Sequence, residues 1–434
     1  MRFVSPVALG LMLALGSASF GVAVPAAIAK EKASQAPKLK LSPSFLPSAQ
    51  KASEAIKKKD IEASKAALAE AETAAVSNDD KYQYYSLLLN YSIVANDAAA
   101  QGKALKGMLD TGLVPADQAG QFNTVVANNA VNAKDYDTAI AYGEKARALG
   151  YKPEQVSPVL AQAIWGKAGN DKAQVLHGLE VFKEGVDAMK ASGQEVPVQW
   201  YQVGVSKAAA VNSIPHLKQW AAMAYDAQPS GENLRTILRV FQRENPTMSN
   251  RENLDLLRLM HVSGGLALKP DYTEYAEMAF KGGLYGEVKS TLDEGRAKGV
   301  LNTGDGADFY SVASQRMAGD KASLSGAERD AAKSATGKIA SATADAYFGY
   351  GDYAKAVSLF ELALQKGGID TDEVNTRMGI AKAMAGDTAG AKATLAKVTT
   401  GARGGIAKLW IDYLNKKSAP AAVAAPAEAA APAS

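Results

Sequence analysis

The chain has 434 residues, contains no cysteine, and carries 48 basic against 45 acidic side chains, for a formal net charge of +3. The lack of cysteine excludes disulfides, thiol catalysis and thiolate-ligated metal sites. The near balance of charge argues against a nucleic-acid partner, because proteins that bind nucleic acids usually carry a strong basic bias.

The chain begins with the pattern of a secretory signal peptide. Arg2 precedes an uncharged apolar run over residues 4–28, and the run ends in small residues. We therefore predict that residues 1–29 are a signal peptide cut after Ala29, which makes the mature protein periplasmic or secreted. The alternative is a membrane anchor, but glycines and Pro25 interrupt the run. No later segment approaches about 18 uninterrupted apolar residues, so no transmembrane segment is expected after cleavage.

Composition and helical periodicity divide the rest of the chain. Residues 30–50 are polar and rich in proline, which predicts a flexible tether. Residues 51–190 are predicted to form N-terminal helical repeats, and residues 197–300 a middle helical section that begins at a proline.

The C-terminal part contains the clearest helical pattern. Residues 301–415 are predicted to form C-terminal helical repeats. The last segment, residues 416–434, is mainly Ala and Pro, and it lacks the large apolar side chains that would offset the entropy of ordering. We expect it to be disordered. No strand-rich region is predicted.

Four stretches of the chain can be superposed so that each one ends on a glycine, namely Gly150, Gly299, Gly367 and Gly401. The last two glycines are 34 residues apart, and the interval before them is twice that length, with a degenerate copy closing at Gly337. A fixed period of this size is typical of a stacked repeat array.

An aspartate stands just before a helical pattern in four of the five copies, at Asp135, Asp320, Asp352 and Asp387. A short acidic side chain there accepts a hydrogen bond from the first free backbone N–H groups of a helix and suits the positive helix end. A glycine stops the helix at the other end. The repeat unit is therefore predicted to be two antiparallel helices joined by a tight turn.

At these residues the chain resembles the tetratricopeptide repeat (TPR) family, whose unit is a 34-residue helix hairpin. Residues that match its motif are Tyr347, Gly351, Tyr353, Ala356, Phe360, Ala363, Gly379, Gly386, Ala391 and Leu395, and Trp200, Val203 and Gly204. The match is good over roughly residues 340–400 and partial near 125–150 and 270–300. The resemblance implies an all-α fold: a helical-hairpin repeat solenoid, or TPR-like superhelix, here with disordered termini.

The resemblance also implies that a partner binds the concave face, which the first helix of each pair mainly forms. In the two best copies this predicts a binding surface of Lys338, Ser341, Asp345, Phe348, Glu373, Thr376 and Ile380. Its mixed charge and single aromatic residue suit an extended peptide held by polar contacts and one apolar pocket.

We find no pattern that requires chemistry. The three histidines, His177, His216 and His261, are not spaced as metal ligands, and Ser263 lacks the nucleophile elbow of a serine hydrolase. No catalytic residue, metal site or cofactor is predicted. The tryptophans are interpreted as core residues, although they are also the residues from which a stacking platform for a ligand is built. They are Trp165, Trp200, Trp220 and Trp410.

The sequence therefore predicts a non-enzymatic protein–protein interaction scaffold of the bacterial cell envelope, which binds a peptide or protein segment on a concave helical surface. The alternatives are an envelope glycan-processing enzyme built on a helical superhelix, with a buried carboxylate in a cleft, and a glycan- or small-molecule-binding module that uses the tryptophans.

Overall fold

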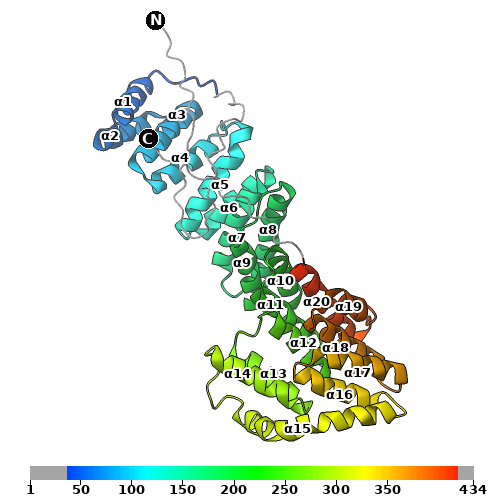
Figure 1. The fold of residues 1–434 in the computed structure, drawn as a ribbon. Helices are drawn as coiled ribbons and strands as arrows, with labels where there is room; N and C mark the ends of the chain where they lie inside the picture. The colour runs from blue at the N-terminus through cyan, green and yellow to red at the C-terminus, as the bar shows by residue number, and fades with distance from the viewer. Residues whose placement is uncertain (1–36, 419–434) are drawn as a thin grey trace, which may run out of the picture. The chain divides into compact units, whose positions relative to one another are not determined.

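The computed structural model describes residues 37–418 of the chain (Figure 1). In this range the regular structure consists of twenty α-helices, with no strand. The chain divides at Val196–Pro197 into two compact units. The predicted signal peptide (1–29) and the part of the predicted tail beyond Ser418 lie outside the described residues. None of the described helices is long and apolar enough to span a membrane.

The first unit contains eight of the described helices. They are α1 (Leu46–Lys57), α2 (Ile61–Ala74), α3 (Asn78–Ala95), α4 (Ala98–Asp110), α5 (Ala116–Asn132), α6 (Tyr136–Ala148), α7 (Pro153–Ala168) and α8 (Lys172–Ala191). Successive helices pair as hairpins, α1 with α2 through α7 with α8, and neighbouring hairpins stack. A hairpin cannot bury its apolar stripe alone, so stacking supplies the interior of this unit.

The second unit contains the other twelve. They are α9 (Val198–Ala210), α10 (Ile214–Ala227), α11 (Gly231–Glu244), α12 (Asn250–Val262), α13 (Lys269–Lys281), α14 (Tyr285–Ala297), α15 (Ala307–Lys333), α16 (Lys338–Gly349), α17 (Tyr353–Lys366), α18 (Thr371–Met384), α19 (Thr388–Leu395) and α20 (Gly401–Ser418). Helix hairpins recur here as well, including α13 with α14, α16 with α17 and α18 with α19. The fold is all-α and TPR-like.

Three of the four predicted aspartate caps are confirmed. Asp135, Asp352 and Asp387 each precede a helix, and each carboxylate accepts a hydrogen bond from the backbone N–H three residues later, at 3.2, 3.1 and 2.8 Å. The prediction that Asp320 is a fourth cap is wrong. Helix α15 runs unbroken through it, because its carboxylate accepts a hydrogen bond from the Tyr350 hydroxyl instead of capping a new helix.

The predicted tether, residues 30–50, is wrong in its last part. Helix α1 begins at Leu46, and the preceding Phe45 is fully buried. The backbone N–H and the hydroxyl of Ser42 both donate to the carboxylate of Asp80 on α3, at 2.8 and 2.7 Å. These contacts fix the segment against the first unit. At the other end, the predicted start of the disordered tail, residue 416, is too early, since α20 extends to Ser418.

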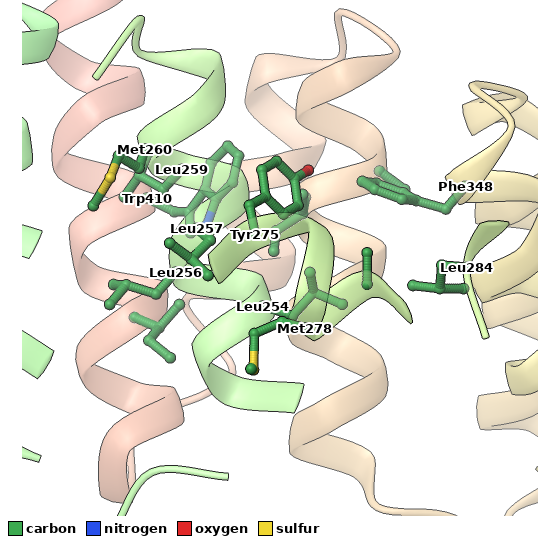
Figure 2. Packing of buried hydrophobic residues seen from close by; sticks show 14 of the residues in the cluster. Leu254, Leu256, Leu257, Leu259, Met260, Tyr275, Met278, Leu284, Phe348 and Trp410 are labelled. Carbon is green, nitrogen blue, oxygen red and sulfur yellow. The ribbon is translucent and has the colours of Figure 1, made fainter. Parts of the chain in front are cut away.

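The second unit is more than a row of hairpins, because it closes around α12. Seven consecutive residues of α12, Leu254–Met260, are buried, so this helix is covered on every side. It contacts α18 and α20, which follow it by more than a hundred residues. In Figure 2, Trp410 of α20 lies against the leucines of α12. Helix α12 therefore forms the centre of the second unit.

Candidate functional site

The predicted binding surface on α16 and α18 is largely inaccessible. Phe348, Thr376 and Ile380 are only 6, 0 and 0 % exposed, so the expectation that they line an open concave face is wrong. The reason is that α18 is itself covered by α12 and α20. Lys338 is exposed and Ser341 is half-buried, but the other members of the set lie around a filled interior.

The two acidic members of that set, Asp345 and Glu373, belong to a buried network of ion pairs. Arg377 Nη1 lies 2.6 Å from Asp345 Oδ2 and 2.8 Å from Glu373 Oε1. Arg403 of α20 donates to Glu373 Oε2 at 3.0 Å. Arg251 of α12 reaches the same carboxylate from the exposed side, at 2.6 Å. The predicted ligand-binding carboxylates are thus already paired with arginines of this chain.

The other part of the network joins α12 to α14. Arg258 donates to Asp255 at 2.9 Å and forms a bidentate ion pair with Glu287, in which both hydrogen bonds are 2.8 Å long. The Tyr275 hydroxyl donates to Glu287 at 2.6 Å. The Arg258 guanidinium also lies 4.2 Å from the centre of the Phe348 ring. Planar, doubly bonded contacts of this kind are the strong form of an arginine–carboxylate pair.

Opposing effects set the pKa values in this network. Burial alone raises the pKa of Glu287, but Arg258 and Tyr275 outweigh it and hold the pKa below its ordinary value. For Asp345 burial wins over the attraction of Arg377, so its pKa is raised. Asp345 Oδ1 is also a buried atom without a hydrogen-bond partner among the described residues. Asp345 is therefore the least well-stabilised carboxylate of the network.

The network joins α12, α14, α16, α18 and α20 of the second unit. Four arginines face four carboxylates, so the charges balance: Arg251, Arg258, Arg377 and Arg403 against Asp255, Glu287, Asp345 and Glu373. A buried carboxylate that acts in catalysis must face a space into which a substrate can enter. The groups here face other helices of the same unit.

The remaining sequence candidates are also structural. All four tryptophans are buried, at 7 % exposure or less, so the interpretation as core residues is confirmed and the stacking platform is wrong. The His261 ring contacts Glu294 at 2.5 Å. The Ser263 hydroxyl donates to the carbonyl of Met260 at 3.0 Å. The two side chains serve separate helix contacts.

A different surface, in the first unit, repeats from one hairpin to the next. A half-buried face of α3 carries Asp79, Gln83, Ser86 and Asn90, at helical spacings of four, three and four residues that place them in one row. A face of α5 carries the same types 38 residues later. These are Asp117, Gln121, Thr124 and Asn128. We call these eight residues the polar stripe.

The polar stripe has unused hydrogen-bonding capacity. Within the described part of the chain, the amides of Gln83, Asn90, Gln121 and Asn128 make no hydrogen bond and are half-buried. Each amide offers a carbonyl acceptor and an NH2 donor. Helices α3 and α5 are the first helices of neighbouring hairpins, and α4 packs against both (Figure 1). In a regular stack of hairpins, equal positions on the first helices fall on the same side.

Sequence reasoning missed the polar stripe because it aligned the repeats on a 34-residue period. The hairpins that contain α3 and α5 turn at Asn96 and Lys134, both in the left-handed conformation, and they close at Gly112 and Gly150, which are 38 residues apart. The signal that was available is the 38-residue spacing of Asp97 and Asp135, which cap the second helices of the two hairpins.

Comparison with known proteins assigns no family to the chain. No family model and no curated protein matches the chain. Among solved structures, it is similar to the apo form of RapI, with 11 % identity over 74 % of this chain and 97 % of that one, and a TM-score of 0.29. It is also similar to yeast Tom70, with 11 % identity, coverages of 86 and 88 % and a TM-score of 0.23. The pentatricopeptide repeat protein PPR10 from maize gives 15 % identity, coverages of 84 and 51 % and a TM-score of 0.24. The assignment to helical-repeat proteins rests on the chain's own hairpins.

Proposed function

We propose that this protein is a non-catalytic interaction scaffold of the bacterial cell envelope, and that it binds an extended segment of a partner protein along the polar stripe. The observation that carries the proposal is the recurrence of the same four side-chain types on α3 and α5. An extended peptide presents N–H and C=O groups at regular intervals, and unpaired amide side chains suit them. Because four of the eight residues are uncharged amides, recognition depends more on the peptide backbone than on its charge.

The two units have different roles in this proposal. The second unit fills its own interior with α12, so it acts as a rigid folded body. The first unit keeps four unpaired amide side chains on successive hairpins and supplies the binding surface. This places the partner on a different part of the chain from the surface that the TPR resemblance predicted.

Site-directed photocrosslinking in living cells tests the binding surface. A photoreactive amino acid replaces Asn90 or Asn128 in the full-length protein, and Lys106, an exposed residue of α4, serves as the matched control. We expect the same discrete adduct from both stripe positions and none from the control. Adducts of equal yield from all three positions, or from none, would contradict the binding role of the polar stripe.

The envelope location rests on the sequence of residues 1–29 and has its own test. Expression of the full-length chain, fractionation of the cells and N-terminal sequencing of the product should give an envelope or secreted protein that begins at Lys30. Recovery of the protein in the cytoplasmic fraction with Met1 intact would overturn the location, and it would leave the crosslinking result unaffected.

A further inference from the structure

Helix α15 is attached to its neighbours in an unusual way. It has 27 residues, but only Ala313, Leu324 and Ala331 are buried. It lies along α14 and α16 (Figure 1). Burial of apolar side chains supplies most of the stability of a helix in a protein. A helix of this length with so few buried side chains is held mainly by other contacts.

The other contacts are hydrogen bonds made by tyrosine hydroxyls, from Tyr285 on α14, Tyr347 on α16 and Tyr350 just after α16. The Tyr350 hydroxyl donates to Asp320 at 2.5 Å, and the Tyr347 hydroxyl donates to Glu328. Lys355 of α17 adds an ion pair to Glu328 at 3.0 Å. The Tyr285 hydroxyl accepts from Arg316 on α15 at 3.0 Å. The second half of α15, residues 316–333, buries only Leu324 and Ala331 and is otherwise bound through polar contacts that water can replace.

The second half of α15 is also a weak helix in itself. It contains Gly319 and Gly326, and a side chain at either position meets little: nothing within 4 Å at Gly319, and only the end of an arginine side chain, 3.8 Å away, at Gly326. Packing therefore does not require glycine here. Each glycine inside a helix costs about 1 kcal/mol relative to alanine. Both the polar contacts that hold residues 316–333 and the glycines within them lower the free energy needed to detach this segment.

We propose that residues 316–333 are a detachable strap, and that the surface beneath them on α14, α16 and α17, made by Tyr285, Tyr347 and Tyr350 with Lys355, binds an acidic helix of a partner protein. In the closed state Asp320 and Glu328 supply the carboxylates that this surface recognises. The two lie eight residues apart, which is a little over two helical turns, so they project from nearly one face. A partner helix with carboxylates at that spacing makes the same contacts.

The surface selects for carboxylates by two means. Tyrosine hydroxyls donate to an ionised carboxylate more strongly than to a neutral acceptor. Lys355 adds a positive charge beside the Tyr347 position, with its ammonium 5.8 Å from the centre of that ring. A basic helix meets the ammonium of Lys355 and is repelled. This surface lies in the second unit and is independent of the polar stripe.

Hydrogen-exchange mass spectrometry of the mature protein tests whether the strap detaches. Residues 316–333 should exchange at least about tenfold faster than α16 and α17, which share the same unit. Replacing both strap carboxylates, Asp320→Asn with Glu328→Gln, should increase that exchange further. Asp330→Asn, an exposed carboxylate of the same helix, is the control and should leave it unchanged. Exchange of the strap as slow as that of α16 would overturn the proposal.

A synthetic, fluorescently labelled peptide with the sequence of residues 316–333 tests the surface. It should bind the Asp320→Asn/Glu328→Gln protein, in which the surface is released, in a fluorescence anisotropy titration. Adding Tyr347→Phe and Tyr350→Phe should weaken binding by about tenfold or more, because two hydrogen bonds to charged groups are lost. If the fourfold variant does not fold, Tyr350→Phe or Lys355→Gln is added alone to the Asp320→Asn/Glu328→Gln protein, and each should also weaken peptide binding.

Two results would overturn the inference about the surface. One is a peptide that binds the released protein and the tyrosine variants equally well, since the tyrosines would then have no role. The other is a stable dimer of the wild-type protein, seen by light scattering, in which the strap of one copy is protected by the other. That result would assign the surface to exchange between copies and not to a partner helix.

Discussion

Arg403 on α20 donates a hydrogen bond to Asp255 on α12, with 3.1 Å between Nη1 and Oδ2, across a sequence separation of 148 residues. Asp255 is fully buried, and the indole N–H of Trp410 donates to its backbone carbonyl at 3.1 Å. These contacts bring the last described helix onto the centre of the second unit. The unit is therefore closed by a charge pair and an aromatic residue acting at the same point.

Removing Arg403 should destabilise the second unit strongly. In Arg403→Ala, the carboxylates of Asp255 and Glu373 each lose a partner in a buried site, and breaking such a pair from one side typically costs about 3–5 kcal/mol. Arg251→Ala is the matched control, because Arg251 binds the same Glu373 but is 64 % exposed, and such pairs contribute about 1 kcal/mol or less. Urea unfolding followed by tryptophan fluorescence measures both. Equal losses in the two variants would contradict the closing role of Arg403.

Two glycine-to-alanine changes should have opposite signs. A Cβ at Gly204 on α9 falls 2.0 Å from the ring of Trp220, which is fully buried and cannot move aside. We expect Gly204→Ala to lower the free energy of unfolding by about 1–3 kcal/mol. At Gly319 there is nothing within 4 Å, so Gly319→Ala should raise it by up to about 1 kcal/mol. Thermal unfolding of the two variants side by side measures the difference, and a gain in Gly204→Ala would refute the packing argument.

The N-terminal segment should depend on the charge of Asp80. Burial raises the pKa of this carboxyl, but hydrogen bonds from Ser42 and Ser77 outweigh burial and lower the pKa from 3.8 to about 2. A lowered pKa means that the carboxylate's contribution is complete above pH 3.8 and is lost as the pH falls towards 2. We expect Asp80→Asn to reproduce the acid effect at neutral pH.

Hydrogen exchange at residues 37–45 measures that effect. The segment should exchange faster in Asp80→Asn than in the wild type, while Asp110→Asn, at an exposed aspartate at the end of α4, should match the wild type. If the segment is equally protected in all three proteins, the contacts of Ser42 with Asp80 do not hold it.

Local features of the fold could be predicted from the sequence, and long-range ones could not. Asp135 and Asp352 were identifiable as caps because the groups that they bind lie three residues away. Asp320 had the same local pattern, but the Tyr350 hydroxyl, 30 residues later, binds it and the helix continues. A local pattern therefore predicts a cap only where no distant side chain competes for the carboxylate.

The candidate site shows the same division. The buried state of Thr376 and Ile380 depends on α12 and α20, which lie far from them in sequence, and no periodicity in α18 reveals that covering. The polar stripe, in contrast, is present in the sequence as two equal rows 38 residues apart, from Gln83 to Gln121. It was predictable in principle once the repeat was aligned on a 38-residue spacing, which the aspartate caps Asp97 and Asp135 show.

The attachment of α15 should be constant near neutral pH and weaken on both sides. Hydrogen bonds from Tyr347 and the ion pair with Lys355 lower the pKa of Glu328, so the contribution of this carboxylate is complete above pH 4.5 and is lost as the pH falls through the lowered value. Burial and the bond to Glu328 raise the pKa of Tyr347 to about 12, so its contribution is complete below pH 10 and is lost as the pH rises towards 12.

The Glu328→Gln variant separates the effect of Glu328 on the pKa of Tyr347 from the effects of burial and of Asp352. Removing the negative charge of Glu328 leaves those two, so the pKa of Tyr347 should move back towards 10. NMR titration of the protein with ring-labelled tyrosine measures this, with Tyr347→Phe to assign the signal and Asp330→Asn as the control. A Tyr347 midpoint that is the same in Glu328→Gln and in the wild type would show that the hydroxyl does not bind the carboxylate in solution. The strap would then have lost the contact on which its recognition of carboxylates depends.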